Sequence, residues 1–455
     1  IENENSENGK YEVVVRSFFQ GNEFYYFVYK DYKDIRFVGA PPASIGKFGG
    51  DTDNWEWPRH TGDFSMFRIY SDQNGNPAEY SESNVPYKPA HSLPLNIGGI
   101  KPGDYAMLLG YPGTTSRYVS SYGIQQLIEY EYPPFIEASK TAMDVLKKYM
   151  DKDKATQLNY AGKYASLANY WKNRIGMIEA ITKNKVIEDK VKEEKEFTKW
   201  ASKSANKERY GNVLENLKNY YNSTNNSIQD KMYLFGVLRG SNYIGTTVRT
   251  GDMLKTYMEQ DESGRESMKP KLIETVNSIY ENIHPEVEKE VLFNLLTLYT
   301  SKVKTTNQPP VVNSWFSRFA PNSKMYSSNT NEYFNQQISQ SVFENKDKLI
   351  DFINSPKAGV LDQDPLYNLS KDIMEHYSKK EGKTIELEDT YDQSQRLFID
   401  GLRKTFPKKV FYPDANSTMR LTYGTVKTLK DNPEKPNDAK LNYYTTLKGM
   451  VAKYK

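Results

Sequence analysis

The chain has 455 residues, with 61 Lys or Arg against 58 Asp or Glu, so its formal net charge is only +3. This balance gives no global basic excess for binding a nucleic acid, and no run of 18 apolar residues predicts a membrane span. Cysteine is absent, which excludes disulfides, thiol catalysis and cysteine metal sites. A chain of this length is expected to form two or more units.

The first part of the chain predicts short strands separated by turns. The Gln-Gly-Asn sequence at residues 20–22 is typical of a hairpin turn between two of them. We expect strands at residues 11–19, 23–29, 35–38, 64–70 and 104–111. Short strands at close intervals predict an all-β barrel or sandwich.

The middle of the chain, residues 124–403, has helical spacing and few strand signals. Leu158, Ala161, Ala165 and Ala168 recur at steps of three and four, and predict one helix face. Amphipathic helices are expected at residues 187–200, 276–303 and 341–353. Their charged runs are most simply explained as solvated helix faces.

A strand pattern returns at residues 418–429. The sequence therefore predicts three parts: a β part over residues 1–120, an inserted helical part over 121–405, and the start of a returning β part over 406–455. A helical insertion in a β domain usually caps or gates the cleft of its host.

Residues 49–70, GGDTDNWEWPRHTGDFSMFRIY, predict a structured loop that runs into a strand. Gly49, Gly50, Pro58 and Gly62 break any helical period. An aromatic and acidic loop carried by a strand is a common place for a functional site.

Asp63 is the best candidate in this loop for the carboxylate of a hydrolytic triad. It follows Gly62, which lets the backbone approach closely, and it precedes large apolar residues, so we expect it to be partly desolvated and paired. A turn or strand-cap aspartate is the alternative. His60 is expected to be structural, because the base of chymotrypsin-like proteases comes from a different strand than the carboxylate. No pair of the four histidines has metal-ligand spacing, so no zinc site is expected.

Four blocks of sequence carry a family resemblance. They are GGDTDNWEWPRHTGDF at residues 49–64, GYPGTT with RY within 110–118, YASLANYWKNRIGM at 164–177 and YPDANSTMRLTYGTV at 412–426. In this order they resemble the bacterial dipeptidyl-peptidase 7 and 11 family, serine exopeptidases that remove dipeptides from free peptide N-termini. The blocks span most of the chain.

The resemblance implies a multi-domain α+β fold: a chymotrypsin-like double β-barrel, partial in this chain, with a large inserted α-helical domain. It implies that Asp63 is the triad aspartate and that Asn54, Trp55 and Asn169 bind the N-terminal amine of the substrate. Amide oxygens suit an α-ammonium group, and an indole can form a flat apolar wall beside it. A helix-packing amide is the alternative for Asn169.

The resemblance further implies that the triad histidine and serine lie outside the segments present here, so we expect the chain alone not to hydrolyse peptides. It implies peptide substrates with a free N-terminus, a homodimer, and a location in the bacterial periplasm or at the outer surface. No nucleic acid and no cofactor are expected. A non-catalytic peptide- or glycan-binding protein and a structural scaffold with a helical interaction domain are the alternatives.

Overall fold

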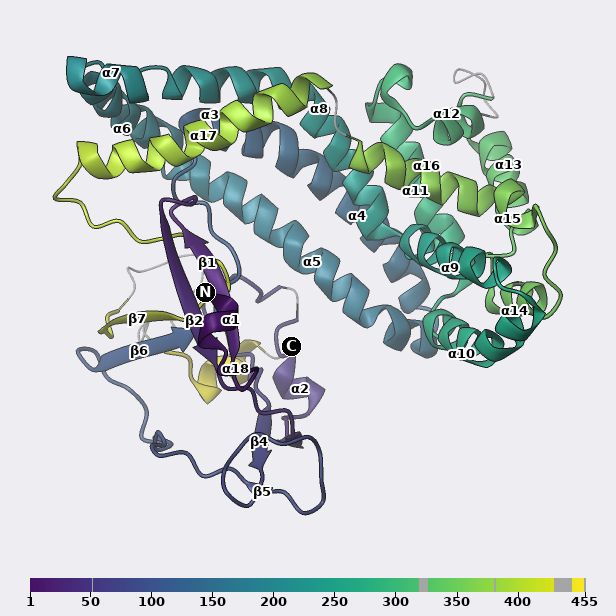
Figure 1. Ribbon diagram of the computed structural model, residues 1–455, viewed down its shortest axis with the longest axis horizontal. Helices are drawn as coiled ribbons and strands as arrows, with labels where there is room; N and C mark the ends of the chain where they lie inside the picture. Colours follow the sequence, from purple (N-terminus) through teal and green to yellow (C-terminus); the bar gives the residue numbers. More distant parts are fainter. Residues whose placement is uncertain (51, 319–325, 380–381, 429–443, 454–455) are drawn as a thin grey trace. The chain divides into compact units, whose positions relative to one another are not determined.

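A computed structural model gives the fold of the chain (Figure 1) and describes residues 1–50, 52–318, 326–379, 382–428 and 444–453. The chain divides into two compact units. Unit 1 comprises Ile1–Val119, Glu196–Val213 and Gln393–Lys455, and unit 2 comprises Ser120–Lys195 and Leu214–Asp392. The division into three consecutive parts, at residues 120 and 405, stays a prediction.

The described residues of unit 1 form three small antiparallel sheets, ordered β1-β2, β3-β4-β5 and β6-β7. The strands are β1 Glu12–Phe18, β2 Glu23–Tyr29, β3 Ile35–Gly39, β4 Met66–Ser71, β5 Val85–Pro86, β6 Tyr105–Gly110 and β7 Arg420–Thr425. The predicted hairpin is confirmed, since Phe18 pairs with Glu23 across the turn. Positive φ angles at Phe19, Gln20 and Gly21 make that turn tight.

Strand β6 pairs with β7 although most of the chain lies between them, from Tyr105 opposite Thr425 to Gly110 opposite Arg420. The β pattern that returns near the end of the sequence therefore completes a sheet begun before residue 120. The predicted strand over 418–429 is shorter in the structure, and residue 429 lies outside the described part of the chain.

The described residues of unit 1 form no closed barrel, so the predicted double β-barrel is not present in this part of the chain. Sheets of two or three strands are too few to close on themselves. Their apolar side chains are correspondingly uncovered: Phe37 is 63% exposed and Leu108 is 70% exposed.

Helices also belong to unit 1. They include α1 Glu2–Asn5, α2 Ala43–Gly46, α7 Ser204–Tyr210 and α18 Leu447–Lys453, together with parts of α6 Val186–Ala201 and α17 Gly382–Thr405. The ring of Phe197 packs against that of Phe398 at 5.2 Å. Arg403 donates to the Glu23 carboxylate at 2.5 Å, which ties α17 to strand β2.

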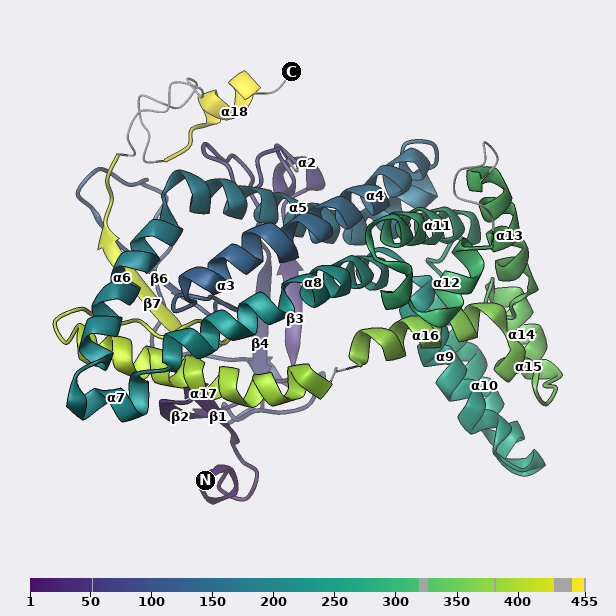
Figure 2. The same ribbon diagram turned by 90° about the horizontal axis from the view of Figure 1, so that it is seen from above.

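Unit 2 is helical, as the sequence predicts. Its elements are α3 Ser121–Gln126, η1 Leu127–Glu131, α4 Tyr132–Met150, α5 Lys154–Lys183, α8 Val213–Gly240, α9 Tyr243–Met258, α10 Glu262–Tyr280, α11 Pro285–Lys302, η2 Thr305–Asn307, α12 Pro310–Phe316, α13 Tyr326–Gln340, α14 Lys346–Asn354, α15 Val360–Gln363 and α16 Pro365–Ser378. Helices α4 and α5 run side by side (Figures 1 and 2). None of the helices within the described ranges is long and apolar enough to cross a membrane.

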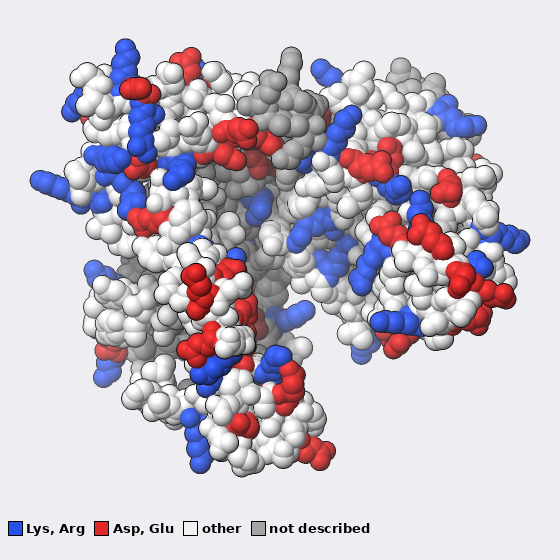
Figure 3. Space-filling model, viewed as in Figure 1, with Lys and Arg blue, Asp and Glu red and all other residues white. Residues whose placement is uncertain are grey.

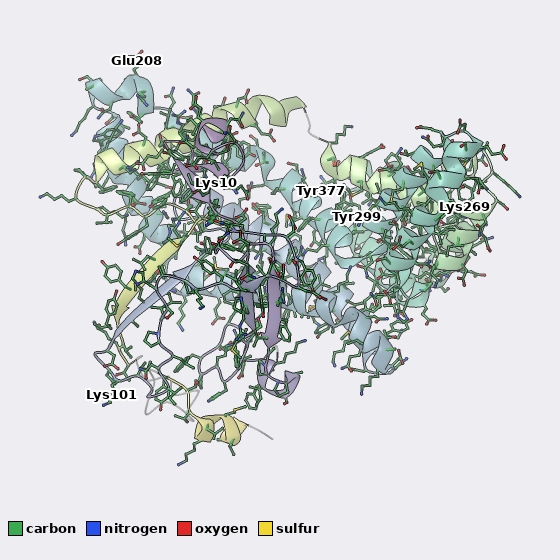
Figure 4. The ribbon with its side chains drawn as sticks, turned by 60° about the horizontal axis from the view of Figure 1, so that its bottom comes forward. Lys10, Lys101, Glu208, Lys269, Tyr299 and Tyr377 are labelled. Carbon is green, nitrogen blue, oxygen red and sulfur yellow. The ribbon has the colours of Figure 1, made fainter. Side chains whose placement is uncertain are left out.

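The core of unit 2 contains buried tyrosines whose hydroxyls find acceptors, as buried polar groups must. Tyr243 is fully buried and donates to the backbone oxygen of Glu344 at 2.8 Å. Tyr299, labelled in Figure 4, donates to the backbone oxygen of Asn307 at 3.3 Å. On the face shown in Figure 3, acidic and basic side chains are interspersed, in keeping with the near-zero net charge.

The predicted helix over 187–200 is confirmed as α6, but two other predictions need correction. The helix expected over 276–303 is two helices, because α10 ends at Tyr280 and Pro285, which lacks an N–H, begins α11. The helix expected over 341–353 begins only at Lys346, where the side chain of Asn345 caps it by accepting from the N–H of Lys348 at 3.0 Å.

The predicted face of α5 is also partly wrong. Leu158 is 78% exposed, whereas Ala168 is buried. Tyr160 and Leu167, which lie on an adjacent face, are buried instead. The spacing identifies a helix correctly, but the position of the neighbouring helix decides which face is covered.

Candidate functional site

The loop that holds three of the four candidate residues is shaped by Gly49. Its φ of +81° lies in the region that favours glycine, and a Cβ there would lie 2.2 Å from the Oδ2 atom of buried Asp53. The N–H of Asp53 donates to the backbone oxygen of Gly49 at 3.1 Å. The start of the loop is therefore a tight turn that only glycine fits.

The end of the loop is fastened to α2. The N–H of Gly62 donates to the backbone oxygen of Ile45 at 2.9 Å, and a Cβ on Gly62 would lie 2.7 Å from the side chain of Ile45. The hydroxyl of Thr61 donates to the backbone oxygen of Phe48 at 2.8 Å. The close approach expected at Gly62 is thus confirmed, and it fixes the backbone just before Asp63.

Asp63 itself is exposed, so the predicted desolvation is wrong. No hydrogen bond or ion pair joins its carboxylate to another residue in the described part of the chain. The reason is that β4 begins only at Met66, and the residue next to Asp63 is also uncovered in the described structure: Phe64 is 56% exposed. His60 is buried, and its ring lies edge-on to Phe48 with 6.3 Å between centroids, which agrees with a structural role.

Asn54 and Trp55 lie next to each other on this loop. Asn54 is half-buried, and its Oδ1 atom accepts from Arg59 at 3.4 Å. Trp55 has a φ of +62°, an uncommon conformation for a bulky residue, and its side chain is 62% exposed. An exposed indole held on strained backbone beside an amide is the kind of arrangement found at ligand sites.

Asn169, the fourth candidate, lies on α5 in unit 2, whereas Asn54, Trp55 and Asp63 lie in unit 1. It is half-buried. Asp153 begins this helix by accepting from the N–H of Thr156 at 2.7 Å, so the long helix has a defined start. Asn173 lies one turn after Asn169 on the same helix face.

In unit 1, hydrogen bonds connect the sequence block at 110–118 to the block at 412–426. The residue types in these blocks did not by themselves predict this contact. Asp414 accepts from the Thr115 hydroxyl at 2.8 Å and from the N–H of Arg117 at 2.7 Å. The N–H of Ser417 donates to the backbone oxygen of Pro112 at 3.0 Å. These contacts fix the turns next to β6 and β7. In the sequence, only the family resemblance indicated that both segments are important.

The whole chain, residues 1–455, matches the family model described as Peptidase S46. It is 43% identical to dipeptidyl-peptidase 7 of Capnocytophaga gingivalis, over 100% of this chain and 62% of that protein. It is 34% identical to an Asp/Glu-specific dipeptidyl-peptidase of Flavobacterium psychrophilum, over 97% of this chain and 60% of that protein.

Solved structures match as well. The crystal structure of Porphyromonas endodontalis DPP11 in complex with the dipeptide Arg-Glu has a TM-score of 0.83 and 27% identity to this chain. The match covers 99% of this chain and 65% of that one. The chain thus spans about three fifths of the length of the relatives that it matches.

Proposed function

Because the chain belongs to the peptidase S46 family, we propose that the protein carrying it is a serine exopeptidase that releases dipeptides from the free N-termini of peptides. The 43% identity to a dipeptidyl-peptidase 7, over the full length of this chain, carries the proposal. Since the chain spans only part of its relatives, the activity is proposed for the full-length protein that contains this sequence.

In this proposal Asp63 is the carboxylate of the catalytic triad. Its role is to orient a histidine and to stabilise the charged form of that histidine while a serine attacks the scissile carbonyl. The hydrogen bond between Gly62 and Ile45 supports the assignment, because it fixes the backbone immediately before Asp63. The histidine and the serine are proposed to lie outside these 455 residues and to cover the carboxylate that is exposed here.

Asn54, Trp55 and Asn169 are proposed to bind the α-ammonium group of the substrate. An ammonium has three donors and no acceptor, so it needs oxygen atoms such as those of asparagine amides. The Oδ1 atom of Asn54 accepts a hydrogen bond from the cationic side chain of Arg59 at 3.4 Å, which supports a role for this oxygen as an acceptor for a positively charged donor. The exposed indole of Trp55 supplies an apolar wall and a π face for the cation.

The resemblance also leads us to propose that the three small sheets belong to a double β-barrel in the full-length protein. The exposed apolar side chains of these strands, such as Phe37 and Leu108, support this proposal because large uncovered apolar patches are rare on monomeric proteins. A homodimer and a location in the bacterial periplasm or at the outer surface are proposed on the resemblance alone.

The test uses the full-length protein and a serine-directed phosphonate inhibitor. We expect release of a fluorophore from dipeptidyl substrates with a free amine, and loss of that release after treatment with the inhibitor. A full-length protein that is folded and cleaves none of these substrates would instead support a non-catalytic binding protein. Cleavage that the inhibitor leaves untouched would contradict the serine mechanism.

A further inference from the structure

Glu288 on α11 is a carboxylate that is 0% exposed. A buried carboxylate must be hydrogen-bonded or paired with a cation, because its removal from water is costly. The carboxylate of Glu288 accepts from the hydroxyl of Tyr160 at 3.0 Å, from the N–H and the side-chain amide of Asn242 at 2.7 Å each, and from the hydroxyl of Ser241 at 3.2 Å. In the described part of the chain it forms no direct ion pair.

The donors to Glu288 come from two other segments of unit 2. Tyr160 lies on α5, whereas Ser241 and Asn242 form the link between α8 and α9. Burial and the charge of Glu288 raise the pKa of the Tyr160 hydroxyl, so this group stays protonated and remains a donor. One buried carboxylate therefore joins α5, the α8–α9 link and α11.

A second residue of α5, Lys163, is joined to Glu288 through an amide. The ammonium of Lys163 donates to the Oδ1 atom of Asn242 at 2.6 Å, and the Nδ2 atom of the same side chain donates to Glu288. Burial lowers the pKa of Lys163, and the charge of Glu288 acts against this decrease. The Asn242 amide thus lies between a cation and an anion, and each of them favours the orientation seen here.

Tyr160 and Lys163 are the first members of a row at steps of three along α5, which continues to Ser166 and Asn169. The hydroxyl of Ser166 accepts from Arg239, at the end of α8, at 3.1 Å. Each step of three residues advances about 4.5 Å along a helix. The first three members of the row are therefore hydrogen-bonded to neighbouring segments, and Asn169 is the next member.

Apolar packing alone fixes the position of α5 weakly. Of its 30 residues, the buried ones are Thr156, Tyr160, Leu167, Ala168 and Ile181. Helix α4 runs alongside α5 (Figure 2), but apolar contacts are non-directional and tolerate small displacements along the axis. Hydrogen bonds are directional, so a displacement of one residue, about 1.5 Å, would separate the Tyr160 hydroxyl from Glu288 and leave a buried charge with fewer donors.

We infer that Glu288 is a positioning residue for the substrate amine, because it fixes α5 through Tyr160 and Asn242 and thereby sets the position of Asn169. Glu288 itself does not touch the substrate. The inference rests on the proposed function, from which Asn169 takes its role. Displacing a group that positions the substrate by about 1 Å can cost on the order of 100-fold in rate, so the place of α5 matters for the amine site.

The test is a double-mutant cycle in the full-length protein, with KM measured for a dipeptidyl substrate that has a free amine. Glu288→Gln keeps the shape of the side chain, but it removes the charge and turns an amide N–H₂ toward donors. We expect KM to rise about tenfold, with a smaller change in kcat. In an Asn169→Ala background the same replacement should raise KM by less than about twofold, because the group that Glu288 positions is already absent.

Tyr160→Phe is a milder variant of the same link. It removes one donor and leaves Glu288 the donors of Ser241 and Asn242, so we expect it to fold. It should raise KM about threefold, and again only when the Asn169 amide is present.

Asp364→Asn is the matched control. Asp364 is a buried carboxylate of the same unit that accepts from the Ser341 hydroxyl at 2.7 Å and from the N–H of Tyr367 at 2.9 Å, and these partners lie outside α5. This variant should lower Tm and leave KM unchanged. Circular dichroism checks that each variant is folded.

KM values within about twofold of the parent in both folded variants, Glu288→Gln and Tyr160→Phe, would overturn the inference. An equal rise in KM with and without the Asn169 amide would also overturn it, because a general loss of stability gives that result. The proposed function fails in a different way, since the parent then releases no dipeptide or Asn169→Ala leaves KM unchanged, and the inference falls with it.

Crystal structures of the full-length parent and of Glu288→Gln test the position of α5 without any measurement of activity. We expect α5 to be displaced relative to α4 in the variant. An unmoved α5 would overturn the inference.

Discussion

Asp414 accepts a hydrogen bond at 2.8 Å from the hydroxyl of Thr115, which is 299 residues earlier in the chain. The same carboxylate oxygen accepts from the N–H of Arg117 at 2.7 Å. This one side chain therefore joins the turn after β6 to the turn before β7, and it helps to close a sheet whose strands are far apart in sequence.

We expect Asp414→Ala to loosen this sheet. Hydrogen bonds to a charged group contribute about 1.5–3 kcal/mol each, and partial exposure reduces this to an expected loss of about 1–2 kcal/mol here. Amide hydrogen exchange in β6 and β7 should become about 5- to 30-fold faster. Asp414→Asn keeps an acceptor oxygen and should have a smaller effect. Unchanged exchange in Asp414→Ala would show that the backbone pairing alone holds the sheet.

The buried carboxyl of Asp34 leads to a prediction about how the stability of the fold depends on pH. It is buried in unit 1, where the Arg36 guanidinium, with further hydrogen bonds from Asn84 and Ser81, lowers the pKa of its carboxyl to about 2. The pKa is lower in the folded than in the unfolded chain, so the ionised carboxylate stabilises the fold above about pH 4, and this stabilisation is lost as the pH falls toward 2.

The measurement compares melting temperatures of the parent and of Asp34→Asn between pH 7 and pH 2. The parent should melt at a higher temperature at pH 7, and the difference should shrink steadily below about pH 4, where Asp34 gains a proton and resembles asparagine. A difference that stays constant over this range would mean that the Asp34 charge does not stabilise the fold.

Asn54→Ala and Asn169→Ala should act on substrate binding in the full-length enzyme. Losing one acceptor for a charged donor costs about 1.5–3 kcal/mol, so KM for a free-amine substrate should rise roughly 10- to 100-fold. Asn74→Ala, in an exposed turn of unit 1, is the control and should change neither KM nor kcat. If Asn169→Ala leaves KM unchanged, Asn169 does not bind the substrate and is an ordinary packing residue on α5.

Asp63→Asn should leave the fold nearly unchanged, because the side chain is exposed and makes no contact that holds the described structure together. Turnover by the full-length enzyme should nevertheless fall by about 10⁴-fold, the loss that follows when a triad aspartate becomes asparagine and the histidine takes the wrong tautomer. The turnover number is measured in stopped assays with a dipeptidyl substrate that has a free amine. Near-full turnover in the folded variant would remove Asp63 from the triad.

The sequence predicts local elements well, because their causes are local. Strand β2 begins at Glu23 and ends at Tyr29 as predicted, since the run of apolar residues and the turn before it lie within ten residues of each other. The break at Pro285 was missed because the residues on both sides of it have helical spacing. The exposure of Leu158 could not be predicted from a single helix.

Sites are harder to predict when distant segments build them. The burial of Asp63 was predicted from its neighbours in sequence, but burial depends on what packs over the loop. The surroundings of Arg174 could not be predicted from the block at 164–177, because Tyr132 and Phe135 approach it only through the packing of α4 against α5. The segment around Asn169 was identified as functional only through its resemblance to the family, because the residue types in it do not by themselves indicate a binding site.

The most direct measurement is mass spectrometry of the products that the full-length protein releases from a ten-residue peptide. With a free N-terminus, the peptide should lose two residues at a time from that end, and its N-acetylated form should be cleaved at least tenfold more slowly because the ammonium that Asn54, Trp55 and Asn169 are proposed to bind is absent. Cleavage within the peptide, or equal rates for the two forms, would contradict the account.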